Sequence, residues 1–131
     1  MQRGILLIDH GSRRAEAHEQ LLDIAERLRS RLRGEEIVSG ENFSTPVAIA
    51  HLEIQSPTIQ EGFSECVRLG ATQIVALPCF LSRGRHVTED IPELLKKAAQ
   101  THGGIPFSMG PPLAEHAGFI ELLFSAFRSD F

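Results

Sequence analysis

The chain is predicted to form a single α/β domain over residues 1–131, in which about four mostly parallel strands carry helices on both faces. Its 131 residues suffice for one compact domain with a core of its own. Short apolar runs alternate with longer segments whose apolar residues recur at helical spacing. Such strand–helix alternation is typical of a parallel sheet built with right-handed crossovers.

The first elements follow directly from the apolar pattern. Residues 4–9 form a continuous apolar run, which is typical of a strand buried on both faces of a sheet. A helix is predicted over residues 15–32, with Gly34 as its end. Residues 35–46 are rich in Gly, Ser, Asn and Glu, so they are predicted to form a surface loop.

The middle of the chain repeats this order. Residues 47–53 are predicted to form the second strand and residues 73–81 the third. The helix between them is predicted to begin with Ser56 as its N-cap and Pro57 in its first turn, and to end at Gly70.

The last two helices enclose a weaker strand. A third helix is predicted to start near Pro92, with Thr88 or Asp90 as its cap. Residues 105–109 form a fourth strand, whose proline places it at an edge of the sheet. Residues 115–127 have apolar side chains at helical spacing and are predicted to form the final helix.

Histidine and arginine follow two of these strands. Residues 9–14 (DHGSRR) come directly after the first strand, and residues 82–92 (SRGRHVTEDIP) directly after the third. Because the carboxyl ends of parallel strands meet at one edge of a sheet, we expect both segments to lie there, beside Glu53 at the end of the second strand. The candidate site residues are His10, Ser12, Arg13, Arg14, Arg83, Arg85 and His86.

These residue types favour a particular chemistry. A neutral imidazole accepts a proton or binds a divalent metal, whereas guanidinium groups hold anions through forked hydrogen bonds. The site therefore suits a polyanion from which protons are removed while a metal is handled. The net charge of −4 argues against a nucleic-acid-binding protein. The apolar runs are too short for a membrane span or a signal peptide, so a cytoplasmic protein is predicted.

Several other enzyme classes lack their motifs. The chain contains no Walker loop, no Gly-x-Gly-x-x-Gly after the first strand and no Gly-x-Ser-x-Gly elbow. A phosphatase with His10 as nucleophile and the arginines as phosphate clamp is the alternative that chemistry alone leaves open. His18, early in the first helix, is predicted to lie at the surface, and a position at the carboxyl edge is the alternative. His51 is either a buried imidazole with satisfied hydrogen bonds or a group that supports the site.

The order of these motifs resembles that of the small sirohydrochlorin chelatases, the CbiX and SirB group. The resemblance extends from Gly4 to about Pro112. It departs at Ser56, where members usually carry a glutamate, but Glu53 is retained. The segments that carry it are residues 10–13 (HGSR), 52–59 (LEIQSPTI), 77–81 (LPCFL), 84–86 (GRH) and 90–92 (DIP).

The resemblance implies a class II chelatase-like fold and an enzyme that inserts Co²⁺, Fe²⁺ or Ni²⁺ into sirohydrochlorin without ATP. His10 and His86 would be the metal ligands and proton acceptors, and Glu53 an accessory carboxylate. The metal is then a substrate, so no tightly bound cofactor is expected.

The resemblance also implies the partners of the chain. The arginines would bind the carboxylates of a tetrapyrrole, and neither nucleic acid nor a membrane is expected to bind. Small members are half the size of the two-domain chelatases, which implies a homodimer. A non-catalytic carrier of tetrapyrrole or metal with the same fold is the second alternative.

Overall fold

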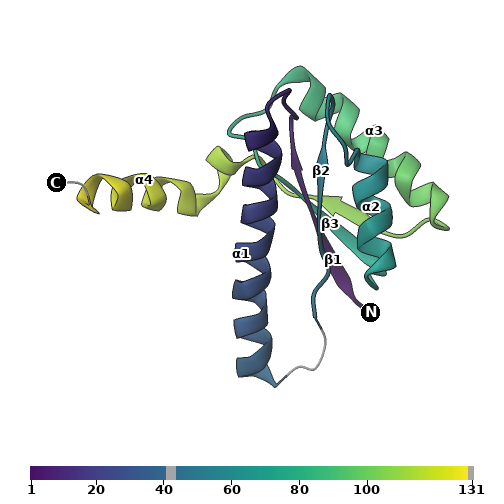
Figure 1. The fold of residues 1–131 in the computed structure, drawn as a ribbon, viewed down its shortest axis with the longest axis horizontal. Helices are drawn as coiled ribbons and strands as arrows, with labels where there is room; N and C mark the ends of the chain where they lie inside the picture. The colour runs from purple at the N-terminus through teal and green to yellow at the C-terminus, as the bar shows by residue number, and fades with distance from the viewer. Residues whose placement is uncertain (41–43, 130–131) are drawn as a thin grey trace.

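The computed structural model of the protein describes residues 1–40 and 44–129, and for residues 85–88 it describes the backbone only. It confirms the predicted α/β fold, with one parallel sheet in the order β2-β1-β3-β4 (Figure 1). The strands are β1 (Arg3–Asp9), β2 (Val47–His51), β3 (Gln73–Pro78) and β4 (Phe107–Met109). The helices are α1 (Ala15–Ser39), α2 (Ile59–Arg68), α3 (Arg85–Thr101) and α4 (Ala117–Ser129), with a short 3-10 turn, η1 (Leu113–Glu115), before α4.

The sheet has a core on each face. Helices α2 and α3 cover one face and α1 covers the other (Figure 1). Successive strand residues point to opposite faces. Leu6 and Ile8 of β1 are therefore buried against Phe63 on the α2 side, whereas Leu7 is buried with Leu21 on the α1 side. The second cluster is the smaller one, because a single helix covers that face.

Helix α1 continues through Gly34, so the prediction that it ends there is wrong. Glu36 accepts hydrogen bonds from the backbone nitrogen and the hydroxyl of Thr45, at 2.9 and 2.6 Å, which tie the added turn to the chain that follows. The helix ends at Gly40, whose φ of +79° is the left-handed conformation that favours glycine. The predicted loop therefore shortens, and its residues 41–43 lie outside the described part of the chain.

Helix α2 begins after Thr58 rather than after the predicted cap, Ser56. The Thr58 hydroxyl accepts a hydrogen bond from the Glu61 nitrogen at 3.1 Å, and the Glu61 carboxylate accepts one from the Thr58 nitrogen at 2.8 Å. This reciprocal pair needs a carboxylate or amide three residues after the cap. The residue three positions after Ser56 is Ile59, which provides neither.

Helix α3 begins at Arg85, so the predicted start near Pro92 is wrong. The buried residues Ile91 and Leu95 lie four apart, and the helical pattern runs across the proline. A proline inside a helix removes one backbone hydrogen bond, but packing of the apolar face outweighs that loss here. Most of the predicted loop at residues 82–92 is therefore helix, and the backbone of His86 lies in its first turn.

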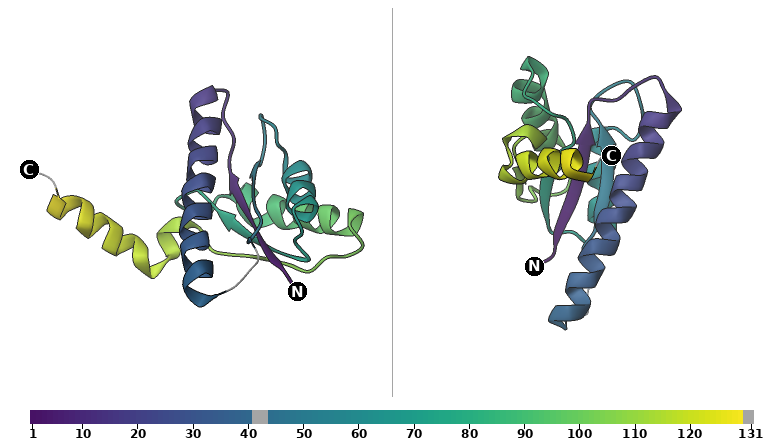
Figure 2. Two further views of the ribbon diagram at one scale, coloured as in Figure 1. Left: turned by 60° about the horizontal axis from the view of Figure 1, so that its bottom comes forward. Right: turned by 90° about the vertical axis from the view of Figure 1, so that its left-hand side faces the viewer.

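Helix α4 projects away from the rest of the domain (Figure 1), and two further views show the same arrangement (Figure 2). It buries none of its residues. Ile120, Leu123, Phe124 and Phe127 are 52–78% exposed. The predicted helix is thus confirmed, but its apolar face contacts no core within the described chain. None of the described helices has the length and apolar character needed to cross a bilayer.

Candidate active site

His10 lies at the edge of the sheet where the parallel strands end. It directly follows β1, and it is exposed to solvent. Its ring lies against the ring of Phe80, with centroids 4.7 Å apart and planes tilted by 39°. The backbone nitrogen of Cys79 donates to the carbonyl of Ile8 at 2.7 Å, which holds the segment after β3 beside the end of β1. The structure therefore brings two of the predicted segments together at His10.

Gly11 makes the turn after His10 possible. Its φ is +94°, and a Cβ at this position would lie 1.9 Å from the carbonyl oxygen of Glu53. The Glu53 nitrogen in turn donates to the carbonyl of His10 at 3.2 Å. The segment after β2 thus lies directly against the turn that carries His10, and Glu53 itself is exposed.

Gln55 joins the same two segments, and sequence reasoning missed it. Its side-chain oxygen accepts a hydrogen bond from the Ser12 nitrogen at 3.1 Å, and its side-chain nitrogen donates to the carbonyl of Arg14 at 3.2 Å. The Ser12 hydroxyl accepts from the Arg14 nitrogen at 3.1 Å, so it shapes the turn before α1. The only sequence signal for Gln55 is its position two residues after Glu53.

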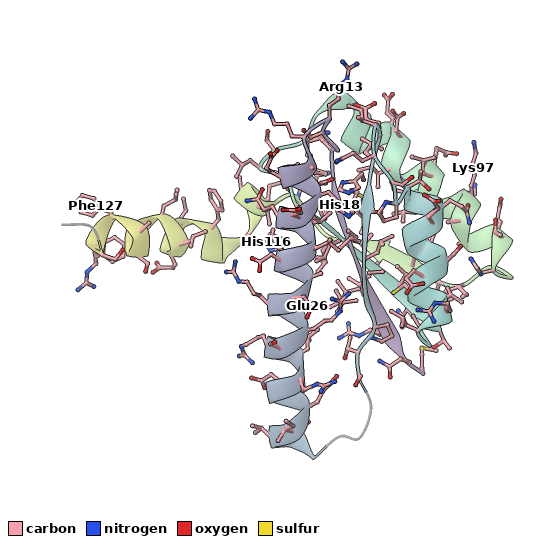
Figure 3. All side chains as sticks on the ribbon, in the orientation of Figure 1. Arg13, His18, Glu26, Lys97, His116 and Phe127 are labelled. Atoms are coloured by element: carbon pink, nitrogen blue, oxygen red, sulfur yellow. The ribbon has the colours of Figure 1, made fainter. Side chains whose placement is uncertain are left out.

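The predicted arginines have different surroundings. Arg13 and Arg14 are exposed beside His10, and no ion pair joins them to a carboxylate in the described part of the chain. Figure 3 shows Arg13 at the outer end of its loop. Arg83 instead donates to Glu115 through Nε at 2.8 Å and Nη2 at 3.1 Å. This guanidinium lowers the pKa of the Glu115 carboxyl.

The Arg83–Glu115 pair therefore fastens η1 to the segment after β3, which distinguishes Arg83 from the two arginines after β1. The side chains of Arg85 and His86 lie outside the described part of the chain. Their roles, and those of the other candidate site residues, remain predictions.

A buried chain of hydrogen bonds lies behind the His10 turn. The β1–β2 register pairs Asp9 with His51, and His51 is fully buried. Its Nδ1 lies 2.5 Å from Asp9 Oδ1 and its Nε2 lies 2.9 Å from His18 Nδ1. Asp9 Oδ1 also accepts from the Gly11 nitrogen at 3.0 Å. His51 is thus a buried imidazole with both nitrogens bonded, in contact with the turn that carries His10.

The prediction of a surface position for His18 is wrong, because this residue is half-buried and hydrogen-bonded to His51. The sequence contained one signal for the contact between Asp9 and His51. Asp9 and His51 are both polar residues at the ends of apolar strands, which places them at the same edge of a parallel sheet.

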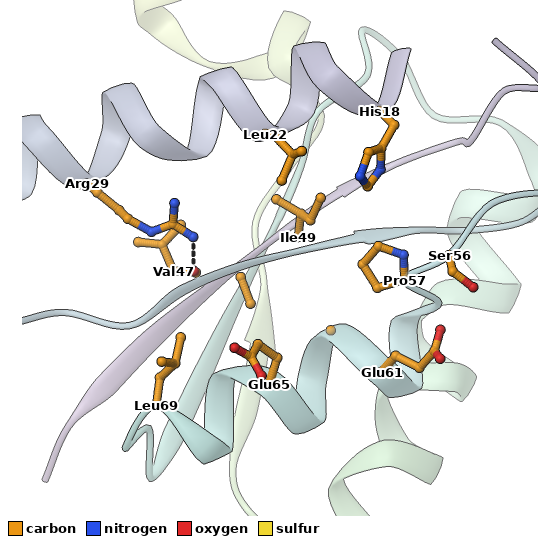
Figure 4. A pocket seen from close by; sticks show the side chains of 12 residues that line it. His18, Leu22, Arg29, Val47, Ile49, Ser56, Pro57, Glu61, Glu65 and Leu69 are labelled. Atoms are coloured by element: carbon orange, nitrogen blue, oxygen red, sulfur yellow. Dashed lines mark hydrogen bonds between the residues drawn. The ribbon is translucent and has the colours of Figure 1, made fainter. Parts of the chain in front are cut away.

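A cavity of about 550 Å³ lies between α1 and α2, beside the edge strand β2 (Figure 4). Val47 and Ile49 contribute apolar side chains to it, and Arg29 donates to the carbonyl of Val47 at 2.7 Å. His18 lines the end nearest to the carboxyl edge of the sheet, but His10 does not border the cavity. The cavity is therefore adjacent to the candidate site rather than part of it.

The two thiols are unsuited to metal binding at neutral pH. Burial raises the pKa of Cys66 to about 12 and that of Cys79 to about 11, so both stay protonated. Among the side chains that the structure describes, which exclude those of residues 41–43, 85–88 and 130–131, no group of three or more His, Cys, Asp or Glu has the arrangement of a metal site. The exposed imidazole of His10 at the carboxyl edge is a candidate metal ligand.

The chain is similar in sequence and in fold to sirohydrochlorin chelatases. The chain is 34% identical over 129 residues to the sirohydrochlorin cobaltochelatase of Methanococcoides burtonii, covering 92% of this chain and 91% of that protein. It is 37% identical over 113 residues to the chloroplastic sirohydrochlorin ferrochelatase of Arabidopsis thaliana, covering 86% of this chain and 46% of that protein.

Among solved structures, the chain superposes on the sirohydrochlorin chelatase SirB from Bacillus subtilis subspecies spizizenii in complex with cobalt. The TM-score is 0.77 at 29% identity, covering 98% of this chain and 50% of that one. The chain thus spans half the length of SirB and less than half that of the Arabidopsis relative. The sequence profile of the CbiX family matches residues 4–130, so the chain belongs to the CbiX family.

Proposed function

We propose that the protein inserts a divalent metal ion, cobalt, iron or nickel, into sirohydrochlorin without ATP. The observation that carries this proposal is the exposed imidazole of His10 at the carboxyl edge, which packs on Phe80 and is followed in the chain by the exposed Arg13 and Arg14. The segment after Phe80 leads within six residues to His86, whose backbone lies in the first turn of α3. Family membership supports this assignment of the site.

The proposed roles follow from what metallation requires. Two pyrrole protons must leave the ring and the metal ion must lose its water ligands. The neutral imidazoles of His10 and His86 hold the ion and accept protons as it transfers. Arg13, Arg14 and Arg85 bind carboxylates of the tetrapyrrole and orient it over the edge of the sheet.

Arg83 and Glu53 have secondary roles in the proposed site. Arg83 contributes less to substrate binding in this proposal, because Glu115 already holds its guanidinium. Glu53 is exposed beside the His10 turn and serves as an accessory carboxylate.

Direct metallation tests the proposal. The protein is incubated with sirohydrochlorin and with Co²⁺, Fe²⁺ or Ni²⁺ in turn, without ATP, and the absorption spectrum is followed. At least one ion should be inserted much faster than in the protein-free control. Tetrapyrrole binding without faster insertion would favour the non-catalytic carrier. Hydrolysis of a panel of phosphomonoesters would favour the phosphatase.

We further propose that two copies of the chain form a homodimer. The sheet face beside α1 is incompletely covered, although parallel sheets are normally covered on both faces. Val75 and Leu77 of β3 are half-buried there and border a cavity of about 390 Å³ with Ile5 and Leu32. Helix α4 has an exposed apolar face that matches this need.

Helix α4 is directed away from its own sheet by the turn that precedes it. The nitrogens of Leu113 and Ala114 donate to the carbonyls of Phe80 and Leu81, each at 3.0 Å, and Glu115 is held by Arg83. These contacts fix the turn from which α4 leaves the domain. The α4 helix of a second copy can instead cover the exposed part of the sheet at Val75 and Leu77. A second copy would also supply the length by which SirB exceeds this chain.

Light scattering coupled to size-exclusion chromatography tests the homodimer. The wild-type chain should elute with twice the mass of one chain. The double substitution Leu123→Asp and Phe124→Asp should shift it to a monomer, because it places two charges on the apolar face of α4. Ser125→Asp, on the polar face, is the matched control and should stay dimeric. A wild-type monomer, or a dimer that survives the double substitution, would contradict the assignment.

A further inference from the structure

The buried hydrogen-bond chain behind the candidate site has no role in the function proposed above. We propose that His51 is a positioning residue, which acts through Asp9 to hold the turn that presents His10. The proposal rests on the geometry of Asp9, His18 and His51 and on the turn at Gly11. It rests on the proposed metallation only for its activity measurement.

For a neutral His51 ring, the two contacts are compatible with one assignment of the hydrogens. The Asp9 carboxylate accepts, so Nδ1 of His51 is the donor in the 2.5 Å contact. Nε2 of His51 then accepts from Nδ1 of His18 at 2.9 Å. Both nitrogens of a fully buried ring are thereby satisfied, and His51 has no freedom to adopt another orientation.

The same Asp9 oxygen connects this ring to the site. Oδ1 of Asp9 accepts from the Gly11 nitrogen at 3.0 Å as well as from His51. His10 lies between Asp9 and Gly11 in the chain, so this hydrogen bond holds the backbone on both sides of His10. Histidines that bind metals are commonly oriented by partners outside the ligand set, and loss of such partners reduces activity or affinity about 10- to 100-fold.

A purely structural role is a poor account of this arrangement. An apolar residue at position 51 would fill a buried site without the cost of satisfying two ring nitrogens. The imidazole instead bonds the residue next to His10, and its other end is fixed by His18, four residues into α1. The network therefore joins the end of β1, the end of β2 and the start of α1.

Two amide substitutions at position 51 separate the two ends of the ring. His51→Asn places an amide nitrogen near the original Nδ1, so it keeps the donor to Asp9 and loses the partner of His18. His51→Gln reaches the original Nε2, so it keeps the contact with His18 and loses the donor to Asp9. We expect His51→Asn to retain kcat within about three-fold and His51→Gln to lose about 10- to 100-fold. KM for sirohydrochlorin should change little in either, because the arginines are untouched.

Two further measurements complete the test. Kinetics are normalised to the folded fraction from denaturant unfolding. The amide resonance of Gly11 is followed by NMR, without substrate or metal, and should shift in His51→Gln but not in His51→Asn. Equal losses in the two variants, a loss that follows the folded fraction, or an unmoved Gly11 resonance in His51→Gln would overturn the proposal. If the wild-type chain fails to metallate sirohydrochlorin, the proposed function fails, and the Gly11 resonance still decides the role of His51.

His18→Ala tests the contact at Nε2 of the His51 ring. It removes the partner of His51 Nε2 but leaves the bond to Asp9, so the loss in kcat should be smaller than in His51→Gln. A larger loss than in His51→Gln would place the effect at the cavity between α1 and α2 and overturn the assignment to Asp9.

Discussion

His10→Ala should reduce the kcat of sirohydrochlorin metallation about 100-fold or more, because a group that accepts protons in the reaction contributes about 10²- to 10⁴-fold. The side chain is exposed and contacts the ring of Phe80, so the free energy of unfolding should fall by no more than about 1 kcal/mol. Binding of sirohydrochlorin, measured by fluorescence quenching or absorption in the absence of metal, should persist because the arginines remain.

His86→Ala should give a comparable loss if the two imidazoles act on one metal ion. The double variant should then lose little more than either single variant, since groups that act as a unit are not additive. His102→Ala provides a control, because His102 caps α3 at the opposite edge of the sheet and bonds Ser64 there. Its turnover per folded molecule should equal that of wild type. Unchanged turnover in His10→Ala or His86→Ala would refute the two-histidine mechanism.

Gly11→Ala should also abolish most activity, through the backbone rather than through a lost functional group. The new Cβ would lie 1.9 Å from the Glu53 carbonyl oxygen at a φ of +94°, so the turn must change shape. We expect the free energy of unfolding to fall by about 2–4 kcal/mol. We also expect kcat to fall well beyond the loss of folded protein, because His10 moves with the turn. Chemical denaturation and metallation kinetics measure the two effects.

Gly40→Ala is the matched control for this substitution. Gly40 also has a positive φ, of +79°, but a Cβ built there meets no atom of the described chain within 4 Å outside its own neighbours and helix backbone. The variant should lose only about 1 kcal/mol and keep wild-type turnover. If Gly11→Ala were as mild as Gly40→Ala, the close approach of Glu53 would not constrain the site.

Sequence pattern predicted the class and order of the elements because both depend on local periodicity. All four strands and all four helices exist where apolar runs or helical spacing indicated them. The wrong predictions for these elements concern the residues at which helices begin or end. Gly34 and Pro92 were expected to mark helix boundaries and lie inside helices instead. Their local cost is a few kcal/mol at most, and contacts beyond them outweigh it.

The candidate site was only partly accessible from sequence. The position of His10 at the carboxyl edge follows from strand order alone, and the structure places it there. The partners of Arg83 could not be predicted, because Glu115 lies 32 residues later in a turn whose direction depends on contacts with Phe80 and Leu81. Gln55 was missed for a similar reason, since its bonds run to residues about 40 positions earlier.

By itself, the sequence determined a parallel α/β domain whose first and third strands lead into histidine- and arginine-bearing segments at one edge. These features depend on apolar periodicity, which is local in the sequence, and on chain topology, which follows from the order of strands and helices. Strand order places Asp9 and His51 at one edge, but the tertiary structure decided that His51 hydrogen-bonds both Asp9, 42 residues away, and His18, 33 residues away. It also decided that α4 leaves its own sheet. The hydrogen bonds depend on strand register, and the direction of α4 depends on which surfaces remain uncovered once the other elements have packed. Neither can be predicted from the residues of one segment.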